Sequence, residues 1–149
     1  MEKLLRDKLE GGKFGKVSPI NSRRMRAVKG RGNRTTEVSL RLALTRAGIR
    51  GWKVHPRGLI GKPDFFFPAT QVAVFVDGCF WHGCAKCGHI PKVNRPYWTA
   101  KILRNQQRDT EKARALRRLG IKVVRFWEHD MQGNLSKCVK TIKAAATKR

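Results

Sequence analysis

Two aspartates of the sequence stand where a carboxylate could do chemistry. Asp64 follows a proline at the start of a Phe-rich segment, and Asp77 ends the most apolar segment of the chain. An unpaired carboxylate is costly at the end of a buried strand, so each of them needs a partner. If neighbouring strand ends bring the two together, they could bind a hard cation such as Mg²⁺, which would polarise a phosphodiester and activate water. The alternative is that the two carboxylates cap strand ends or pair with arginine.

A cysteine-rich segment follows directly and indicates a second kind of metal site. Cys79, Cys84 and Cys87 lie close enough in sequence to bind one tetrahedral Zn²⁺, and such crowding in an intracellular protein favours metal over disulfides. A fourth ligand is needed. We favour His129, because it follows a strand that could return to the cysteines. The other candidates are His82, His89 and Cys138.

The charge of the chain predicts a polyanionic partner. Its 149 residues include 34 Lys and Arg against 10 Asp and Glu, which gives a net charge of +24. Nucleic acid is the partner that this balance favours. The sequence has neither a run of about 18 apolar residues nor a signal peptide, so we expect a cytoplasmic protein without a membrane segment.

These residues need a scaffold, and hydrophobic periodicity predicts an α/β fold. Helices are expected over 35–48, from Pro96 to Gly120 and over 134–146, and strands over 52–55, 64–67, 71–77 and 121–127. The strand at 71–77 is apolar enough to be buried on both faces. This order implies one domain over residues 22–149, with a mixed β-sheet flanked by helices, preceded by a flexible basic arm over residues 1–21.

Several motifs together resemble a known family. Pro63, Asp64 and Asp77 are spaced as in the PD-(D/E)xK nucleases, although Cys79 stands where that superfamily usually has lysine. The order of the segments is similar to that of the very short patch repair endonucleases, from about Ser22 to Asp130. The segments are RRMRAV with TTE, GKPDFFF, GCFWHGC, YWTAKILRNQQRD and VVRFWEH.

The resemblance implies a restriction-endonuclease-like fold and a set of site residues. Asp64 and the backbone carbonyl of Val76 would bind Mg²⁺, and His82 would be the catalytic histidine in place of the missing lysine. Glu37 would orient water or a second ion. Asp77 would assist metal binding or proton transfer, although the best-known member of the family has histidine there. The structural zinc ligands would be Cys79, Cys84, Cys87 and His129.

The resemblance also implies how DNA is bound. Phe80, Trp81 and Trp98 would wedge between base pairs, and insertion costs a few kcal/mol per unstacked step, which a mismatch lowers. Trp98 could instead belong to the core, and His82 could be a zinc ligand or a packed core histidine. The remaining expected DNA contacts are Met25 and four residues spaced along one helix face, Lys101, Arg104, Asn105 and Arg108.

The function that the resemblance implies is Mg²⁺-dependent nicking of double-stranded DNA at T:G mismatches, which arise from deaminated 5-methylcytosine. It further implies a monomer at the nucleoid of a prokaryote, with a mismatch-repair scaffold protein as an expected partner. Two alternatives remain open. A restriction or mobile-element nuclease of the same fold would cut matched DNA, and a non-enzymatic zinc protein would only bind nucleic acid.

Overall fold

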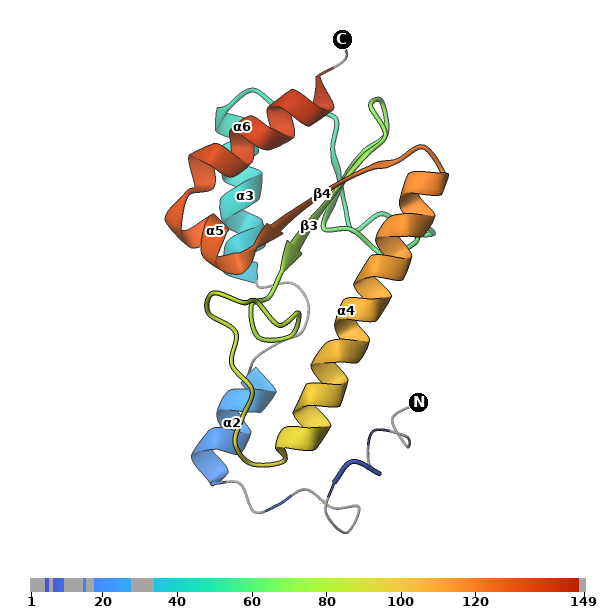
Figure 1. Ribbon diagram of the computed structural model, residues 1–149. Helices are drawn as coiled ribbons and strands as arrows, with labels where there is room; N and C mark the ends of the chain where they lie inside the picture. The colour runs from blue at the N-terminus through green and yellow to red at the C-terminus, as the bar shows by residue number, and fades with distance from the viewer. Residues whose placement is uncertain (1–4, 6, 10–14, 16–17, 28–33, 148–149) are drawn as a thin grey trace.

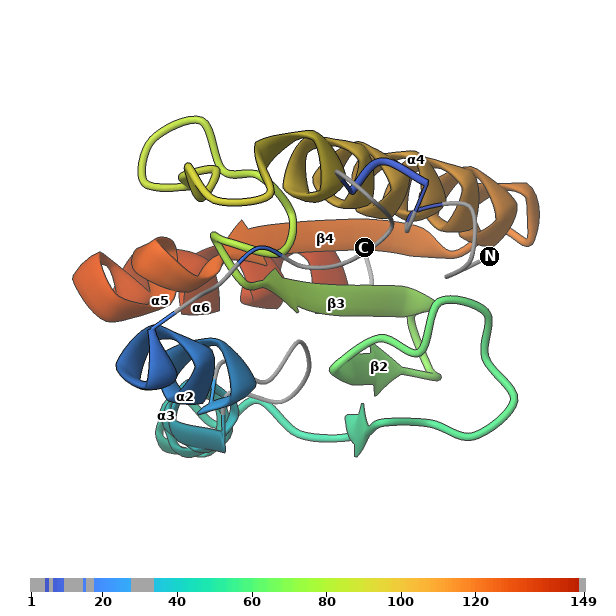
Figure 2. The same ribbon diagram turned by 90° about the horizontal axis from the view of Figure 1, so that it is seen from below.

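A mixed sheet of four strands forms the centre of the molecule. The computed structural model describes residues 5, 7–9, 15, 18–27 and 34–147. In Figure 2 the strands lie in the order β1-β2-β3-β4. The pairs β1–β2 and β2–β3 are antiparallel, whereas β3–β4 is parallel. The bounds are Lys53–Val54 for β1, Phe65–Phe67 for β2, Val72–Asp77 for β3 and Lys122–Trp127 for β4. The four predicted strands are thereby confirmed.

The described chain contains five helices, and all but the first of them lie beside the sheet (Figure 1). Three of them were predicted from periodicity, whereas the short α5 was not, because six residues with one buried apolar side chain show no repeating apolar pattern. No helix in the described ranges is long and apolar enough to span a membrane. The helices are α2 (Pro19–Ala27), α3 (Arg34–Arg46), α4 (Arg95–Arg118), α5 (Glu128–Gly133) and α6 (Leu135–Ala146).

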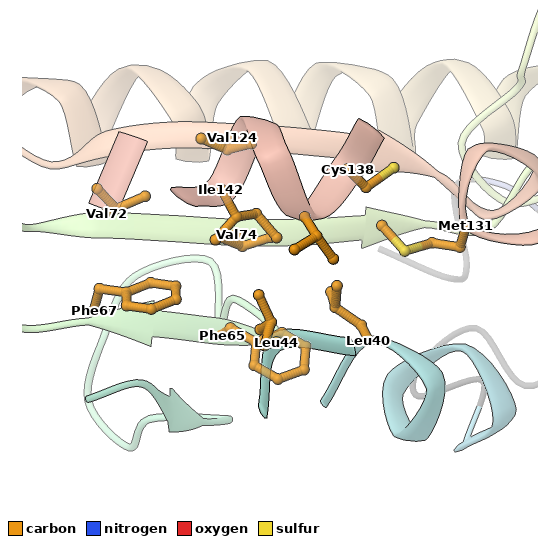
Figure 3. Close-up of a cluster of buried hydrophobic side chains, with 11 residues drawn as sticks. Leu40, Leu44, Phe65, Phe67, Val72, Val74, Val124, Met131, Cys138 and Ile142 are labelled. Atoms are coloured by element: carbon orange, nitrogen blue, oxygen red, sulfur yellow. The ribbon is translucent and has the colours of Figure 1, made fainter. Parts of the chain in front are cut away.

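The two faces of the sheet bury different layers, because side chains alternate along a strand. Val72 and Val74 point into the larger apolar cluster, which Leu40 and Leu44 of α3 and Ile142 of α6 complete (Figure 3). On the opposite face a smaller cluster packs under α4; its buried members are Ala73, Phe75, Leu116 and Ile121. The expectation that β3 is buried on both faces is therefore confirmed.

The same alternation places polar residues of the strand ends on the face of α4. Asp77 lies two residues after Phe75 on β3, and Arg125 is the register partner of Phe75 on β4. Asp64 lies two residues before Phe66, which packs against the smaller cluster. Three charged side chains are thus directed into the space between the sheet and α4.

Much of the predicted N-terminal arm lies outside the described residues, so its boundary at residue 21 stays a prediction. Helix α2 begins within it, at Pro19. The side chain of Met25 lies outside the described part of the chain, although its backbone belongs to α2.

Candidate active site and metal centre

A pocket of about 500 Å³ opens between the strand ends and α4. Its wall includes four of the residues that the sequence predicts for the magnesium and catalytic site, namely Asp64, Val76, Asp77 and His82. Further charged groups of the wall are Lys62, Lys101, Arg108, Asp109, Lys112 and Arg125. The predicted residues are therefore brought together in one polar cavity.

Asp64 directly precedes β2, and a backbone N–H group binds its carboxylate. Its Oδ2 accepts a hydrogen bond of 2.7 Å from the N–H of Val76. Burial raises the pKa of this carboxyl, and the nearby charges of Asp77 and Glu37 act in the same direction, against the opposing effects of Val76 and His55. A buried carboxylate whose charge is disfavoured in this way is a group that a bound cation would stabilise.

Asp77 is engaged by arginine, which is the alternative that the sequence left open. Arg125 donates from Nε to Oδ2 over 2.7 Å and from Nη2 to Oδ1 over 2.6 Å. Burial acts to lower the pKa of Arg125, but the hydrogen bonds and charge of Asp77 outweigh it and raise that pKa. The guanidinium thus stays charged beside the pocket.

His82 pairs with Asp109, a pocket residue that contacts the predicted site without having been predicted. The Nδ1 atom of His82 is hydrogen-bonded to Oδ2 of Asp109 and lies 3.9 Å from Oδ1 of Asp77. Burial acts to raise the pKa of Asp109, but His82 and Arg125 outweigh it and lower that pKa. An ionised Asp109 accepts a hydrogen bond from Nδ1–H, which leaves the lone pair on Nε2 of His82.

Glu37 reaches this region through a second histidine. Its Oε2 lies 2.8 Å from Nε2 of His55, and the backbone N–H of His55 donates to the carbonyl of Asp64. His55 lines the pocket, and its φ of 44° is the left-handed region that non-glycine residues seldom adopt. Glu37 itself is not part of the pocket wall, so its proximity to the site is indirect.

The four predicted zinc ligands form one cluster that could hold a metal ion, with their ligand atoms within 4.8 Å of one another. Nδ1 of His129 lies 3.3 Å from Sγ of Cys79, 3.6 Å from Sγ of Cys84 and 3.3 Å from Sγ of Cys87. In a tetrahedral zinc site with Zn–S bonds of about 2.3 Å and Zn–N bonds of about 2.0 Å, donor atoms lie about 3.5 to 3.8 Å apart. The cluster fits such an ion.

The thiols of this cluster need a cation to ionise together. Burial acts to raise the pKa of Cys84, but backbone N–H groups of Cys87 and Lys86 lower it overall. Hydrogen bonding to Cys79, burial and the charges of its two neighbours raise the pKa of Cys87 to about 12. A bound cation would remove this competition, because metal ligation requires thiolates.

Three aromatic rings of the predicted wedge pack against one another. The ring centroid of Phe80 lies 5.1 Å from that of Trp81 and 5.5 Å from that of Trp98, and the two indoles lie 6.1 Å apart. Nε1 of Trp81 is buried without a hydrogen-bond partner. A buried indole N–H without a partner is costly, so the position of Trp81 is held by its contacts with the other rings and not by a hydrogen bond of its own N–H.

Helix α4 holds the backbone of this loop through two neighbouring amides. Asn105 donates from Nδ2 to the carbonyl of Trp81 over 2.9 Å, and Gln106 donates from Nε2 to that of His82 over 3.1 Å. Lys101 lies over the ring of Trp81 and donates to the Tyr97 hydroxyl. Lys101 and Asn105, expected as DNA contacts, therefore also bind the loop; Arg104 and Arg108 lie half-buried along the same helix.

Gly83 is where the loop passes closest to α4, and its replacement by Ala is expected to damage the site. A Cβ atom there would lie 2.6 Å from Cγ2 of Ile102 and 2.7 Å from Nε2 of Gln106, and the φ of +64° disfavours any side chain. We expect Gly83→Ala to lower the free energy of unfolding by about 1–3 kcal/mol, measured by urea denaturation. Gly48→Ala is the matched control, because Gly48 has a φ of +70° and no atom within 4 Å of the added Cβ. Equal losses in the two variants would contradict the close approach.

Sequence reasoning missed Asp109, Arg125 and His55. Asp109 carried a weak signal, as an acidic residue in a strongly basic helix. Arg125 carried a stronger one, because it interrupts the apolar residues of its strand. No pattern in the sequence distinguishes His55.

Comparisons with known proteins identify a family and several relatives that this chain is similar to. Residues 18–88 match the family model "DNA mismatch endonuclease Vsr", a range that includes β1, β2, β3 and the three clustered cysteines. The chain is 38% identical over 132 residues to the type II nicking enzyme V.NaeI of Lentzea aerocolonigenes, covering 84% of this chain and 80% of that protein. It is 39% identical over 124 residues to the type II nicking enzyme V.NmeDIP of Neisseria meningitidis serogroup C, with 81% and 82% covered. It is 33% identical over 115 residues to the DNA mismatch endonuclease Vsr of Escherichia coli strain K12, with 75% and 71% covered.

Proposed function

The chain belongs to the Vsr family of DNA mismatch endonucleases, and we propose that it nicks one strand of duplex DNA at T:G mismatches in a Mg²⁺-dependent reaction. It is a DNA-nicking endonuclease with a restriction-endonuclease-like fold. The observation that carries the finer proposal is the pocket whose wall contains both the half-buried carboxyl of Asp64 and the His82–Asp109 pair. A cluster of aromatic rings adjoins this pocket.

Asp64 is the residue that we assign to Mg²⁺, with the backbone carbonyl of Val76 as a second ligand. The support is that burial disfavours the charge of Asp64, and that Val76 lies against it in the pocket wall. When bound, Mg²⁺ would withdraw electrons from the scissile phosphodiester and stabilise the negative charge that develops there. Glu37, held by His55, would help to order water beside this position.

His82 is the residue that we assign to proton transfer. An ionised Asp109 that accepts the hydrogen bond from Nδ1 leaves Nε2 able to take a proton from water or, once protonated, to give one to the leaving oxygen. This pair would supply the general acid–base function that lysine serves in related nucleases. Asp109 would be a positioning residue, because it acts through the imidazole.

DNA contacts are assigned to the aromatic cluster and to the basic residues beside it. Phe80, Trp81 and Trp98 form one apolar surface next to the pocket, and such rings can enter a base step that a mismatch has weakened. Lys101, Arg104 and Arg108 lie three and four residues apart on α4, and Lys101 and Arg108 line the pocket. A chain with a net charge of +24 would add phosphate contacts that do not depend on sequence.

Zinc is the ion that we assign to the cluster of three cysteines and His129, in a structural role. Nε2 of His129 lies 3.3 Å from Oδ1 of Asp130, and this contact would keep Nδ1 directed at the ion.

Because outer-shell partners of this kind orient a ligand, we expect Asp130→Ala to weaken zinc binding about 10- to 100-fold, measured by competition with a chromophoric chelator. Glu111→Ala, at an exposed position of α4, removes the same charge and is expected to leave zinc affinity unchanged. Unaltered affinity in Asp130→Ala would contradict this orienting role.

The substrate is tested with plasmid-length duplexes that are either matched or contain one T:G pair, incubated with the zinc-loaded protein with and without Mg²⁺. A break in one strand of the mismatched duplex alone, dependent on Mg²⁺, is the expected result. Equal nicking of the matched duplex would support the second candidate, an enzyme that nicks a matched sequence. Several relatives are named type II nicking enzymes and not mismatch endonucleases, which keeps this candidate in view. Cleavage of neither duplex would contradict both.

A further inference from the structure

Arg125 is a charged residue of the pocket wall to which the proposed reaction gives no role. Its guanidinium holds both carboxylate oxygens of Asp77, at 2.7 and 2.6 Å. Its Nη2 also lies 3.5 Å from Oδ1 of Asp109. Arg125 therefore connects a carboxylate at the end of β3 with one on α4, and the latter is the partner of His82.

The guanidinium is fixed in orientation as well as in position. Two parallel hydrogen bonds to Asp77 determine its rotation within its own plane. Its Cζ atom lies 4.7 Å from the centroid of the Phe75 ring, which packs against it from β3. The side chain is only 25% exposed. These contacts leave Arg125 little freedom to follow a DNA phosphate, and they indicate an internal role.

The position of Arg125 matters because a second cation could otherwise bind there. Asp77, His82 and Asp109 offer ligand atoms within 4.8 Å of one another, a spacing that would suit a divalent metal ion. Such an ion would meet the like charge of Arg125 and would compete for the oxygens that the guanidinium already binds. Lys62, Arg108 and Lys112 in the same wall add further positive charge.

We propose that Arg125 is a positioning residue whose guanidinium takes the place that a second divalent ion would otherwise occupy. It keeps Asp77 from binding such an ion, and it fixes Asp109 where Asp109 orients His82. The inference rests on the proposed function, since it takes Asp64 as the divalent-ion ligand and His82 as the proton-transfer group. It changes the predicted role of Asp77. That carboxylate anchors Arg125 and does not bind Mg²⁺.

Counting bound Mn²⁺ tests the inference without any reaction. The full-length, zinc-loaded protein is titrated with Mn²⁺ as a substitute for Mg²⁺, and the free ion is measured by electron paramagnetic resonance. We expect about one ion per wild-type chain, about two for Arg125→Met and about one again for Arg125→Met combined with Asp77→Asn. The high positive charge of the chain suppresses non-specific binding of cations, so the count should be clear.

If Arg125→Met does not fold, Asp77→Asn alone still tests the inference. The amide of this variant has nearly the same shape as the Asp77 carboxylate, and its oxygen still accepts a hydrogen bond from Arg125. We expect its Mn²⁺ affinity to lie within threefold of the wild type. Loss of the ion in Asp77→Asn, or no additional ion in a folded Arg125→Met, would overturn the inference. Retention of the wild-type ion in Asp64→Asn would instead overturn the proposed function, so the two failures are distinguishable.

Kinetics separate a positioning role from an ordinary ion pair. Arg125→Lys keeps the charge but loses the two-point hold on Asp77, so we expect kcat to fall about 10- to 100-fold while KM for DNA stays within twofold. Arg118→Lys, at an exposed position of α4, makes the same exchange and is the matched control. A variant Arg125→Lys with a lowered Tm but an unchanged kcat would show that the pair is only structural.

Discussion

Replacing Asp64 with Asn is expected to lower the nicking rate about 10³-fold or more. The amide has almost the same shape as the carboxylate and can still accept the hydrogen bond from Val76, but it lacks the negative charge that would bind Mg²⁺. A bound metal ion contributes several kcal/mol to charge stabilisation in a transition state, and about 4 kcal/mol corresponds to a factor of about 10³. Single-turnover cleavage of a supercoiled plasmid with one T:G pair measures the effect.

Binding measurements show whether this loss belongs to the chemical step. Asp64→Asn raises the net positive charge of the chain, so its affinity for DNA should not fall. Glu111→Gln removes an acid at an exposed position of α4 and should retain the wild-type rate. A rate for Asp64→Asn within tenfold of the wild type would refute the assignment of Mg²⁺ to this residue.

Replacing His82 with Ala is expected to slow nicking about 10²- to 10⁴-fold, the usual contribution of a general acid or base. Asp109→Asn should cost less, because it removes only the group that orients the imidazole. The double variant should be no slower than His82→Ala, since Asp109 has no function once its partner is absent. All three rates are measured under single-turnover conditions.

The zinc content and Tm of His82→Ala are the controls, because His82 lies between two cysteines of the metal cluster. Both should match the wild type, since the imidazole contacts Asp109 and not the thiols. An additive effect in the double variant would mean that the two residues act separately, which would contradict the hydrogen-bonded pair.

Local patterns predicted most of the fold. Periodicities of two and of about 3.6 residues gave the four strands and the three longer helices, because these elements bury a face of their own. Helix α3 differs in detail. It begins at Arg34 and ends at Arg46, whereas the prediction was 35–48, and Thr36 is a buried residue of its first turn. The short α5 spans six residues and buries only Met131, so it has no repeating apolar pattern from which it could be predicted.

The site could be predicted as a list of residues but not as a set of contacts. Asp64, His82 and the cysteines stand in motifs whose chemistry is local. The pairing of His82 with Asp109 spans 27 residues and that of Asp77 with Arg125 spans 48, so both depend on how α4 and β4 pack. The sequence left open that Asp77 could pair with arginine. It could not select one arginine among the 34 basic residues.

Helix α4 carries a consequence for protein engineering. Within about three turns it holds Trp98 of the aromatic surface, Asn105 and Gln106 against the loop backbone, and Asp109 against His82. Each residue of a helix adds about 100° of rotation and about 1.5 Å of rise. Inserting one residue between Trp98 and Asn105 would therefore rotate and shift Trp98 relative to Asn105, Gln106 and Asp109. The proposed mismatch preference could therefore not be exchanged as a separate module, and a graft of specificity would have to move this helix and the cysteine-rich loop together.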